Sequence, residues 1–335
     1  MVDAGTSGEH GFPTDDRGIV LARSMREVGQ EAALYAAVRR GDLVRIRPGA
    51  YRAPSPGDMS LSATERDARR HRFLVQAAAT KLRRPVFTGY SAVALHGLPI
   101  VGRWPDEVEV LIARPTGSRR PGIRYIAATT KPPTVTVDGI TVVTIEHALL
   151  RLARSAPLIT ALTATDAALW RPRARGAQPK TTTERLRETH TAMLPYPGSR
   201  RVEAVLARAT DRAESPLETV SRVDFEELGF PQPVLQHHIE LPELGQDADI
   251  DFWWPAHGVA GEADGVGKYQ REPGVDATIE TVLAEKARED AIRRRVRAFV
   301  RWTWADAWKR DPLRAKLQEA GLPIVPRPTR FIRLS

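Results

Sequence analysis

Apolar positions recur at helical spacing in two short stretches near the N-terminus, and a hairpin pattern follows them. The stretches LARSMREVG and EAALYAAVRRG both end in Gly, the residue that best adopts the left-handed C-cap of a helix. The next stretch, DLVRIRPGAYRAP, places apolar residues on either side of a Pro-Gly turn, which predicts a two-stranded hairpin. Two short helices and a basic hairpin form the plan of a winged helix-turn-helix, which we assign to residues 16–55.

The segments before and after this region, residues 1–15 and 56–212, have other sequence patterns. Residues 1–15 are polar and rich in Gly, Asp and Thr, so we expect them to be disordered. Residues 56–170 mix helical and strand patterns and predict a mixed α/β middle domain. The expected helices and strands of this domain cover residues 60–84, 107–113, 123–128, 140–144, 145–154 and 158–170. We interpret residues 171–212 as a linker and helical connector, with helices in TTERLRETHTAML and RRVEAVLARAT.

After residue 212 the pattern predicts a helix, three strands, a second helix and a last strand. The run SPLETVSRVDFEELG has a capping Ser, Pro at the first helical position, Glu three residues after the cap and a terminal Gly, so it delimits one helix. The expected later elements are strands in PVLQHHIEL, DADIDFWWP and HGVAGEADG, a helix at 278–294 and a strand in VRAFVRWTW. We assign residues 213–312 to an α/β domain and 313–335 to a C-terminal tail, which makes the chain an α+β multidomain protein.

Composition narrows the range of functions. The 335 residues contain no Cys, which excludes disulfide frameworks, thiolate zinc sites and cysteine nucleophiles. The sequence shows no signal segment and no long apolar run, so we expect a cytoplasmic protein without membrane contact. The 50 Lys and Arg exceed the 41 Asp and Glu, and the excess is uneven: residues 211–264 are strongly acidic and both flanks are basic. A basic protein with an acidic island suits an acidic partner such as DNA, although an Arg-rich composition alone also occurs without function.

Four carboxylates of the acidic region are candidates for chemistry. Glu218 lies on the expected first helix, Asp251 on the second strand, and Glu262 and Asp264 on the third strand. Because strand side chains alternate, Glu262 and Asp264 share one face and are predicted to meet Asp251. Oxygen ligands select Mg²⁺ or Mn²⁺, and such an ion can activate water against a phosphodiester. The alternative is that these acids are exposed strand ends or the remnant of an inactive site.

The runs SPLE, DIDFWWP, GEADGVGKY, LAEKAREDAIR and RWTWADAW occur in one order between residues 213 and 310. In this order they resemble the very-short-patch-repair-like endonuclease domain of the PD-(D/E)XK superfamily. The resemblance implies metal-binding and catalytic roles for Glu218, Asp251 and Glu262. The resembled domain has a Lys two residues after its last acid, which here is Glu262, and this chain has Asp264 at that position. A carboxylate there can add a metal ligand but no positive charge. Lys268 is the alternative cation for the catalytic site.

The winged-helix interpretation makes residues 31–40 a recognition helix for the DNA major groove and places the basic hairpin on phosphates or in the minor groove. The alternative is a winged helix that serves only as a protein-interaction module. The predicted DNA-binding side chains are Tyr35, Arg39, Arg40, Arg45, Arg47 and Arg52.

Two further runs, VRRGDLVRIRPGAYR and GYSAVALHGLPIVGRWPDEVEVLI, lie within residues 16–170. They resemble the AbiEi-like antitoxins of the abortive-infection AbiE systems, which are type IV toxin–antitoxin modules. The resemblance implies an N-terminal winged helix that represses its own operon, and a toxin protein as a second partner beside DNA.

Three functions follow from the sequence. The first is a DNA-binding protein with a divalent-metal-dependent, endonuclease-like domain, associated with toxin–antitoxin or phage-defence systems. The second is a catalytically silent AbiEi-like antitoxin and transcriptional autorepressor. The third is a scaffold that neutralises a toxin protein. The sequence leaves the DNA target and the oligomeric state open.

Overall fold

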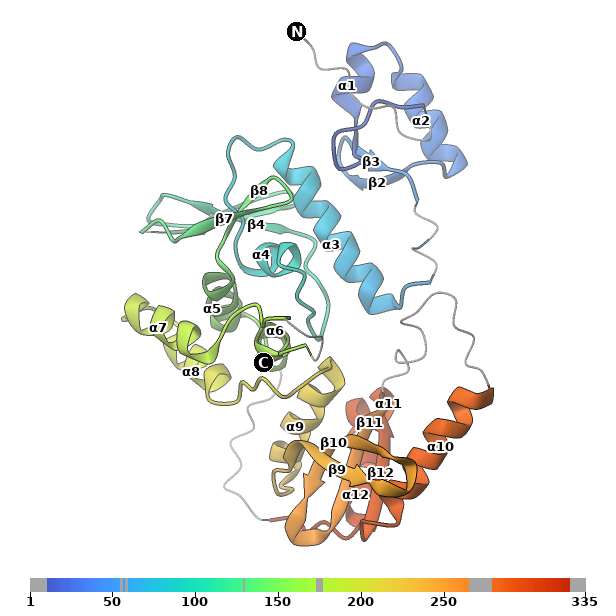
Figure 1. Ribbon diagram of the computed structural model, residues 1–335. Coiled ribbons are helices and arrows are strands. Elements are labelled where there is room, and N and C mark those ends of the chain that lie inside the picture. The colour runs from blue at the N-terminus through green and yellow to red at the C-terminus, as the bar shows by residue number, and fades with distance from the viewer. Residues whose placement is uncertain are drawn as a thin grey trace. The chain divides into compact units, whose positions relative to one another are not determined.

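The computed structural model shows a mixed α+β protein with several small sheets (Figure 1). It describes residues 11–54, 57, 60–128, 130–172, 177–264 and 279–325, and these form twelve α-helices. No helix within these residues has both the length and the apolar character needed to span a membrane. The chain divides into two compact units, and each unit takes two separate parts of the sequence. The first unit comprises Met1–Ser155 and Glu188–Ser199, and the second comprises Ala156–Arg187 and Arg200–Ser335.

The first unit begins with two helices and a small sheet, as the apolar pattern predicts. The helices are α1 (Ala22–Glu27) and α2 (Glu31–Arg40), and α2 ends at a left-handed Gly41 with φ of 85°. The sheet has the order β1-β3-β2, and its strands are β1 (Val20–Leu21), β2 (Val44–Arg47) and β3 (Ala50–Arg52). Both helices and the hairpin β2–β3 are therefore confirmed, and β1 is an additional strand that pairs with β3.

Only part of the segment expected to be disordered can be compared with the structure. Residues 1–10 lie outside the described residues. Within the described part, the Asp15 side chain accepts hydrogen bonds from the backbone N–H groups of Arg17 and Ile19, at 3.0 and 2.9 Å. Local order thus begins before residue 16, because a carboxylate oxygen satisfies the N–H groups of the turn that leads into β1.

The middle of the first unit contains three helices, a three-stranded sheet of order β4-β6-β5 and the hairpin β7–β8. The elements are α3 (Ala63–Ala79), α4 (Gly89–Leu95), β4 (Val108–Ile112), β5 (Ser118–Arg120), β6 (Ile123–Ala127), β7 (Thr134–Val137), β8 (Ile140–Val143) and α5 (Ile145–Ser155). Helix α3 starts at a capping box in which Ser62 and Glu65 exchange hydrogen bonds, which fixes its first turn. The expected helices and strands of this region are confirmed, and α4, β5 and β7 are additional.

The winged segment and α3 share a hydrophobic core. Ile19, Leu21 and Ala50 of the small sheet pack against Ala77 near the end of α3. On the same helix, Phe73 lies under the guanidinium group of Arg52, 4.1 Å from the ring centroid. The two parts of the first unit are thus joined by burial of apolar surface as well as by the chain.

The second unit is built on a four-stranded sheet of order β12-β11-β10-β9, in which β9, β10 and β11 are antiparallel and β11 and β12 are parallel. Its other elements are helices that precede, cover and follow this sheet. The elements are α6 (Leu158–Leu169), α8 (Ser199–Leu206), α9 (Pro216–Leu228), β9 (Val234–Leu241), β10 (Gln246–Trp254), β11 (Val259–Asp264), α10 (Ile279–Arg293), β12 (Ala298–Thr303), α11 (Trp304–Lys309) and α12 (Asp311–Glu319). Helix α7 (Thr183–Met193) crosses the boundary between the two units. The helices and strands expected for this region are confirmed.

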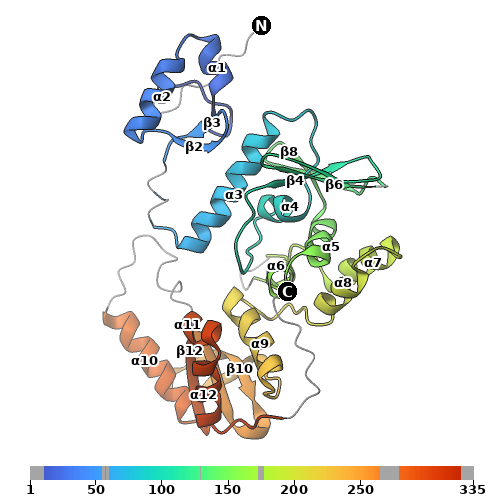
Figure 2. The ribbon, with the colours of Figure 1, turned by 180° about the vertical axis from the view of Figure 1, so that it is seen from behind.

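Helices α9 and α10 cover opposite faces of this sheet, as both views show (Figures 1 and 2). On one face, Phe225 of α9 makes edge contacts with the rings of Phe252, Trp254 and Trp302, with centroids 5.2 to 5.6 Å apart. On the other face, α10 packs through Ala291 and Ile292 on a separate apolar cluster. Each helix buries one stripe of side chains against the sheet. A sheet covered by helices on both faces encloses a hydrophobic core on each face in this way.

The segment expected to be a C-terminal tail, 313–335, contains folded structure. Leu313 and Leu317 are fully buried on α12, and Leu322 is also buried. Leu313 and Leu317 lie four residues apart and form the apolar stripe of α12, and Leu322 follows the end of this helix. The described part of this segment therefore belongs to the core of the second unit.

A buried ion pair attaches α6 to the second unit. Asp166, 1% exposed, pairs with Arg222 of α9. Its other partners are the Thr219 hydroxyl at 2.9 Å and the Thr210 backbone N–H at 2.9 Å. A buried carboxylate is stable only with such partners. Helix α6, which the sequence pattern groups with the middle domain, is thus a part of the second unit.

Truncation of Phe225 is expected to destabilise the second unit strongly. The Phe225→Ala change removes a fully buried ring that contacts three other aromatic rings, so the free energy of unfolding should fall by about 3–5 kcal/mol. Urea denaturation followed by tryptophan fluorescence measures this loss. The control Val234→Ala alters a half-exposed residue of β9 and should change the free energy by less than about 0.5 kcal/mol. Equal effects of the two changes would contradict this packing.

Candidate functional site

Glu218 is placed by the start of α9. The Ser215 hydroxyl accepts a hydrogen bond from the Glu218 backbone N–H at 3.2 Å and donates one to Glu218 Oε1 at 2.7 Å. Glu218 Oε2 accepts from the backbone N–H of Glu214 at 2.9 Å. The carboxylate is buried, with 3% exposure, and folds back over its own helix N-terminus. This is the N-terminal capping pattern that the sequence predicts.

Asp251 lies where β10 and β11 separate. The last paired residues of the two strands on this side are Phe252 and Gly261. Beyond them, the backbone N–H of Ala263 donates to Asp251 Oδ2 at 2.9 Å, so a carboxylate oxygen takes the place of a backbone acceptor. Asp251 is 8% exposed. The side chain is thus held between the strands by the sheet itself.

Gln236 connects these two carboxylates. Its side-chain amide nitrogen lies 3.1 Å from Glu218 Oε2 and 3.3 Å from Asp251 Oδ1, and it donates to both. Its backbone φ is 49°, in the left-handed region that residues other than Gly rarely adopt. One neutral amide therefore bridges the two acids, at a strained position in the middle of β9.

Glu262 has a different environment. Its carboxylate pairs with Arg288 of α10 at 3.0 Å and with Arg301 of β12 at 3.3 Å. Arg301 stands beside Glu262 in the parallel register of β11 and β12, and it also pairs with Glu285 and Glu289 of α10. The acid is buried but enclosed by two cations.

Burial and like charge perturb both glutamates. Burial raises the pKa of Glu218 to about 7, and the charge of Asp251 adds to this shift. Burial also raises the pKa of Glu262, although Arg288 opposes the shift, while Asp251 again adds to it. Asp251 therefore lies within the electrostatic field of both glutamates. Perturbed carboxylates of this kind are frequent at functional sites.

The three acids differ in their counter-charges. Glu262 has two guanidinium partners. Within the described residues, no Lys, Arg or His side chain lies at ion-pair distance from Glu218 or Asp251. The negative charge that lacks a cation is thus concentrated on the Glu218–Asp251 pair.

The donor chemistry of this pair fits a hard divalent cation, since carboxylate oxygens are the ligands that Mg²⁺ and Mn²⁺ take. The described residues contain no group of three His, Cys, Asp or Glu side chains arranged to hold a metal ion. Asp251, Glu262 and Asp264, which the sequence predicts as metal ligands, are not such a group within these residues, and their role stays a prediction. Glu262 is paired with two guanidinium groups. The residues present would hold an ion through Glu218 and Asp251.

Asp264 and Lys268 complete the expected catalytic set. Asp264 is the last residue of β11 and is half-buried. Burial acts to lower the pKa of Arg301, but the charges of Glu262 and Asp264 help to raise it above its ordinary value. Both acids thus act on the same guanidinium group, as strand alternation predicts. Lys268 lies outside the described residues.

The sequence-based interpretation missed the role of Gln236. An amide carries no charge, so a search for clusters of ionisable residues does not find it. The available signal is the pairing of β9 with β10, because residues 235 and 252 are partners and residues 237 and 250 are partners. Gln236 and Asp251 therefore stand opposite each other.

Helix α2 presents the residues predicted to read DNA. Tyr35 is 43% exposed and its hydroxyl contacts Glu31 at 3.4 Å. Arg39 is exposed and has no ion-pair partner among the described residues. Arg40 pairs with Asp42 at 2.7 Å. Arg39 is thus the more available cation of the two.

The hairpin arginines have three different environments. Arg45 is exposed. Arg47 is half-buried, and burial lowers its pKa, while Tyr125 on β6 acts in the opposite direction. Arg52 lies over the Phe73 ring and donates to the carbonyl oxygen of Ala53 at 2.9 Å. Two of the three side chains therefore contact the protein itself, and Arg45 extends into solvent.

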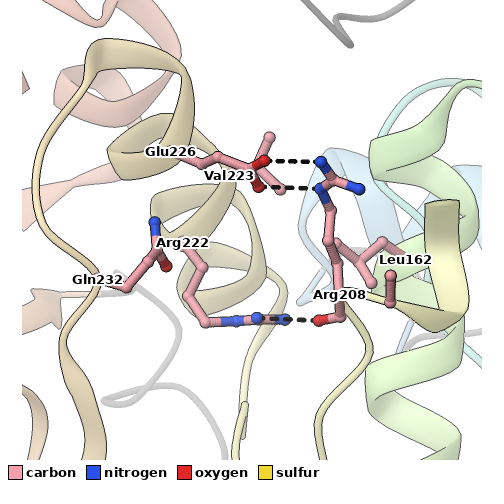
Figure 3. A pocket seen from close by; sticks show the side chains of 7 residues that line it. Leu162, Arg208, Arg222, Val223, Glu226 and Gln232 are labelled. Carbon is pink, nitrogen blue, oxygen red and sulfur yellow. Dashed lines mark hydrogen bonds and ion pairs between the residues drawn. The ribbon is translucent and has the colours of Figure 1, made fainter. Parts of the chain in front are cut away.

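A separate pocket of about 340 Å³ lies in the second unit, and neither Glu218 nor Asp251 lines it (Figure 3). Arg208 and Glu226 line it and form a two-pronged ion pair at 2.9 and 2.6 Å. Arg222 donates to the carbonyl oxygen of Arg208 at 3.0 Å, beside Gln232. These charged groups pair with one another. Their contacts hold the segment between α8 and α9 against α9.

Comparison with known proteins adds no family name to this geometry. The chain matches no protein-family model, and it matches no curated protein. The function is therefore inferred from the residues themselves.

The stability of the protein is expected to depend on the ionisation of Glu218. In the unfolded chain this carboxyl loses its proton near pH 4.5, whereas the folded protein retains it up to about pH 7. The free energy of unfolding should therefore fall as the pH rises between these values, by at most roughly 3 kcal/mol at about 1.4 kcal/mol per pKa unit. The Glu218→Gln variant should lack this dependence.

Urea denaturation at several pH values measures this effect. Glu240→Gln is the matched control, because Glu240 is an exposed carboxylate on β9. This control should retain the pH dependence of the unchanged protein. A Glu218→Gln protein with the same dependence as the unchanged protein would show that Glu218 is not the titrating group.

Proposed function

We propose that the protein binds DNA through its N-terminal helices and hairpin and carries a divalent-metal-dependent, endonuclease-like C-terminal unit. The observation that supports this function best is the Glu218–Asp251 pair, two buried acids from α9 and β10 with no cation at ion-pair distance among the described residues. Burial and like charge raise the pKa of Glu218 to about 7, and perturbed carboxylates without counter-ions are frequent at functional sites. The setting we propose is a toxin–antitoxin or phage-defence system.

The residues of the chain have distinct roles in this proposal. Glu218 and Asp251 would hold Mg²⁺ or Mn²⁺, and the bound ion would supply charge stabilisation and an activated water at a phosphodiester. Gln236 keeps the two carboxylates side by side. Arg288 and Arg301 hold Glu262 in place beside the pair and are shared with Glu285 and Glu289 of α10.

DNA binding is the second part of the proposal. Tyr35 and Arg39 are exposed on α2, and Arg45 is exposed on β2. Cationic side chains without protein partners are available to phosphates and release counter-ions when they bind them. The alanines on the exposed face of α2 offer no hydrogen bonds to base edges, so backbone contacts would dominate over sequence readout.

A catalytically silent, antitoxin-like repressor is the competing function. Two observations favour it: Asp264 stands where a nuclease of the resembled class has Lys, and Glu262 is already neutralised by two guanidinium groups. In this case the C-terminal unit would only fold or bind, DNA would be held for repression, and a toxin protein would be the second partner.

Metal-dependent nicking is the expected outcome for the purified protein. Supercoiled plasmid incubated with the protein and Mg²⁺ or Mn²⁺ should relax, and chelation of the metal should stop the reaction. Asp251→Asn removes one charge of the pair and should lower the nicking rate by about 100-fold or more, on the scale of a lost charge-stabilising group. Agarose gel electrophoresis of the plasmid measures the rate.

Asp249→Asn is the matched control for this experiment, because Asp249 lies on the same strand and contacts His238. It should nick at the unchanged rate. Binding of Mn²⁺ measured by calorimetry should also be lost in Asp251→Asn and kept in the control. If the unchanged protein binds duplex DNA but neither nicks it nor binds Mn²⁺, the nuclease proposal fails and the silent repressor remains.

Replacement of Arg39 is expected to weaken DNA binding more than replacement of Arg40. Arg39 has no ion-pair partner among the described residues, whereas Arg40 would first have to leave Asp42. For Arg39→Gln the slope of log affinity against log salt should decrease by about 0.9, the value for one phosphate contact. Fluorescence anisotropy of a labelled duplex measures this slope. A larger effect of Arg40→Gln would contradict the assignment.

A further inference from the structure

Four cationic side chains from three segments meet where the hairpin joins α3. They belong to the C-terminus of α3, to α1 and to β2, and we call them the junction cluster: Lys81, Arg23, Arg45 and Arg47. The Lys81 ammonium group donates to the carbonyl oxygen of Pro48 in the hairpin turn. Arg23 donates to the carbonyl oxygen of Thr80 at 3.3 Å. These bonds tie the α3 terminus to α1 and to the hairpin turn.

The charges of the junction cluster are not compensated by acids. None of its members forms an ion pair with a carboxylate among the described residues. Burial lowers the pKa of Lys81, and the charges of Arg47, Arg23 and Arg45 lower it further. The three arginines therefore all lie near enough to Lys81 to act on its charge.

The end of α3 explains only part of this charge. The C-terminus of a helix carries about half a negative charge, which favours one nearby cation. Arg23 and Lys81, which donate to carbonyl oxygens at this end of α3 and in the hairpin turn, supply that positive charge. Arg45 is exposed, and among the described residues neither it nor Arg47 donates a side-chain hydrogen bond to the end of α3. The positive charge that these bonds leave over is available to an anion from outside the first unit.

We propose that the junction cluster binds the phosphate backbone of duplex DNA, so that the DNA contact extends from the hairpin onto Lys81 and Arg23. The inference rests on the proposed DNA-binding function and adds residues that the winged-helix interpretation does not include. Cations supplied by several segments of one rigid core suit a series of phosphates, because successive phosphates of one strand lie several ångströms apart. The shared core of the small sheet and α3 keeps these cations in register.

The test is the salt dependence of the affinity of the full-length protein for a labelled duplex. Lys81→Met keeps the length of the side chain and removes its charge, and Arg45→Gln alters an exposed residue without protein partners among the described residues. Each change should reduce the slope of log affinity against log salt by about 0.9, and the double variant by about twice that value. Circular dichroism and urea denaturation confirm that each variant folds.

Arg103→Gln is the matched control. Arg103 is an exposed Arg next to Trp104, whose carbonyl oxygen accepts from Arg70 in the first half of α3. This position is about three helical turns from Lys81 along α3, so the control should keep the full slope. If the unchanged protein binds duplex DNA and both cluster variants keep the full slope, the inference is wrong and DNA binding stands. If the unchanged protein binds no duplex at low salt, the DNA-binding function itself is wrong.

Discussion

Two carboxylates that lie close together in a protein interior need a proton, a cation or strong hydrogen-bond donors, and the second unit is arranged around this need. Asp251 is fixed between two strands by the Ala263 backbone, and Glu218 is fixed by its helix cap. Gln236 provides the only side-chain amide in the described residues that donates to both. The sheet, the helix and the bridging amide thus hold Glu218 and Asp251 close together, although the negative charges of the two carboxylates repel each other.

The basic side chains of the second unit are distributed unevenly around these acids. Arg288 and Arg301 neutralise Glu262, while the Glu218–Asp251 pair is left to neutral donors. Glu285 and Glu289 of α10 in turn share Arg301. The acids of the site thus fall into two halves. Glu262 is the balanced half, with cationic partners, and the Glu218–Asp251 pair is the unbalanced half, with neutral donors. The proposed metal site lies in the unbalanced half.

The sequence predicts elements well where one face of an element is apolar, and it predicts contacts poorly. Helix α9 is delimited correctly because its cap, Pro and terminal Gly are local signals. Helix α4 is missed because nearly all of its residues are buried, which leaves no polar face to show a helical period. The ion pairs of Glu262 and the bridge at Gln236 depend on strand register and side-chain reach. Those contacts are set by tertiary packing, which one sequence does not display.

The allocation of the chain to the two units has a practical consequence. The backbone passes from one unit to the other after Ser155, after Arg187 and after Ser199. A single cut at any of these points therefore leaves at least one of the two fragments with an incomplete unit; a cut after Arg187, for example, separates the α6 carboxylate of Asp166 from Arg222. The proposed DNA-binding and hydrolytic roles are thus better dissected by side-chain replacement in the intact polypeptide than by a single cut.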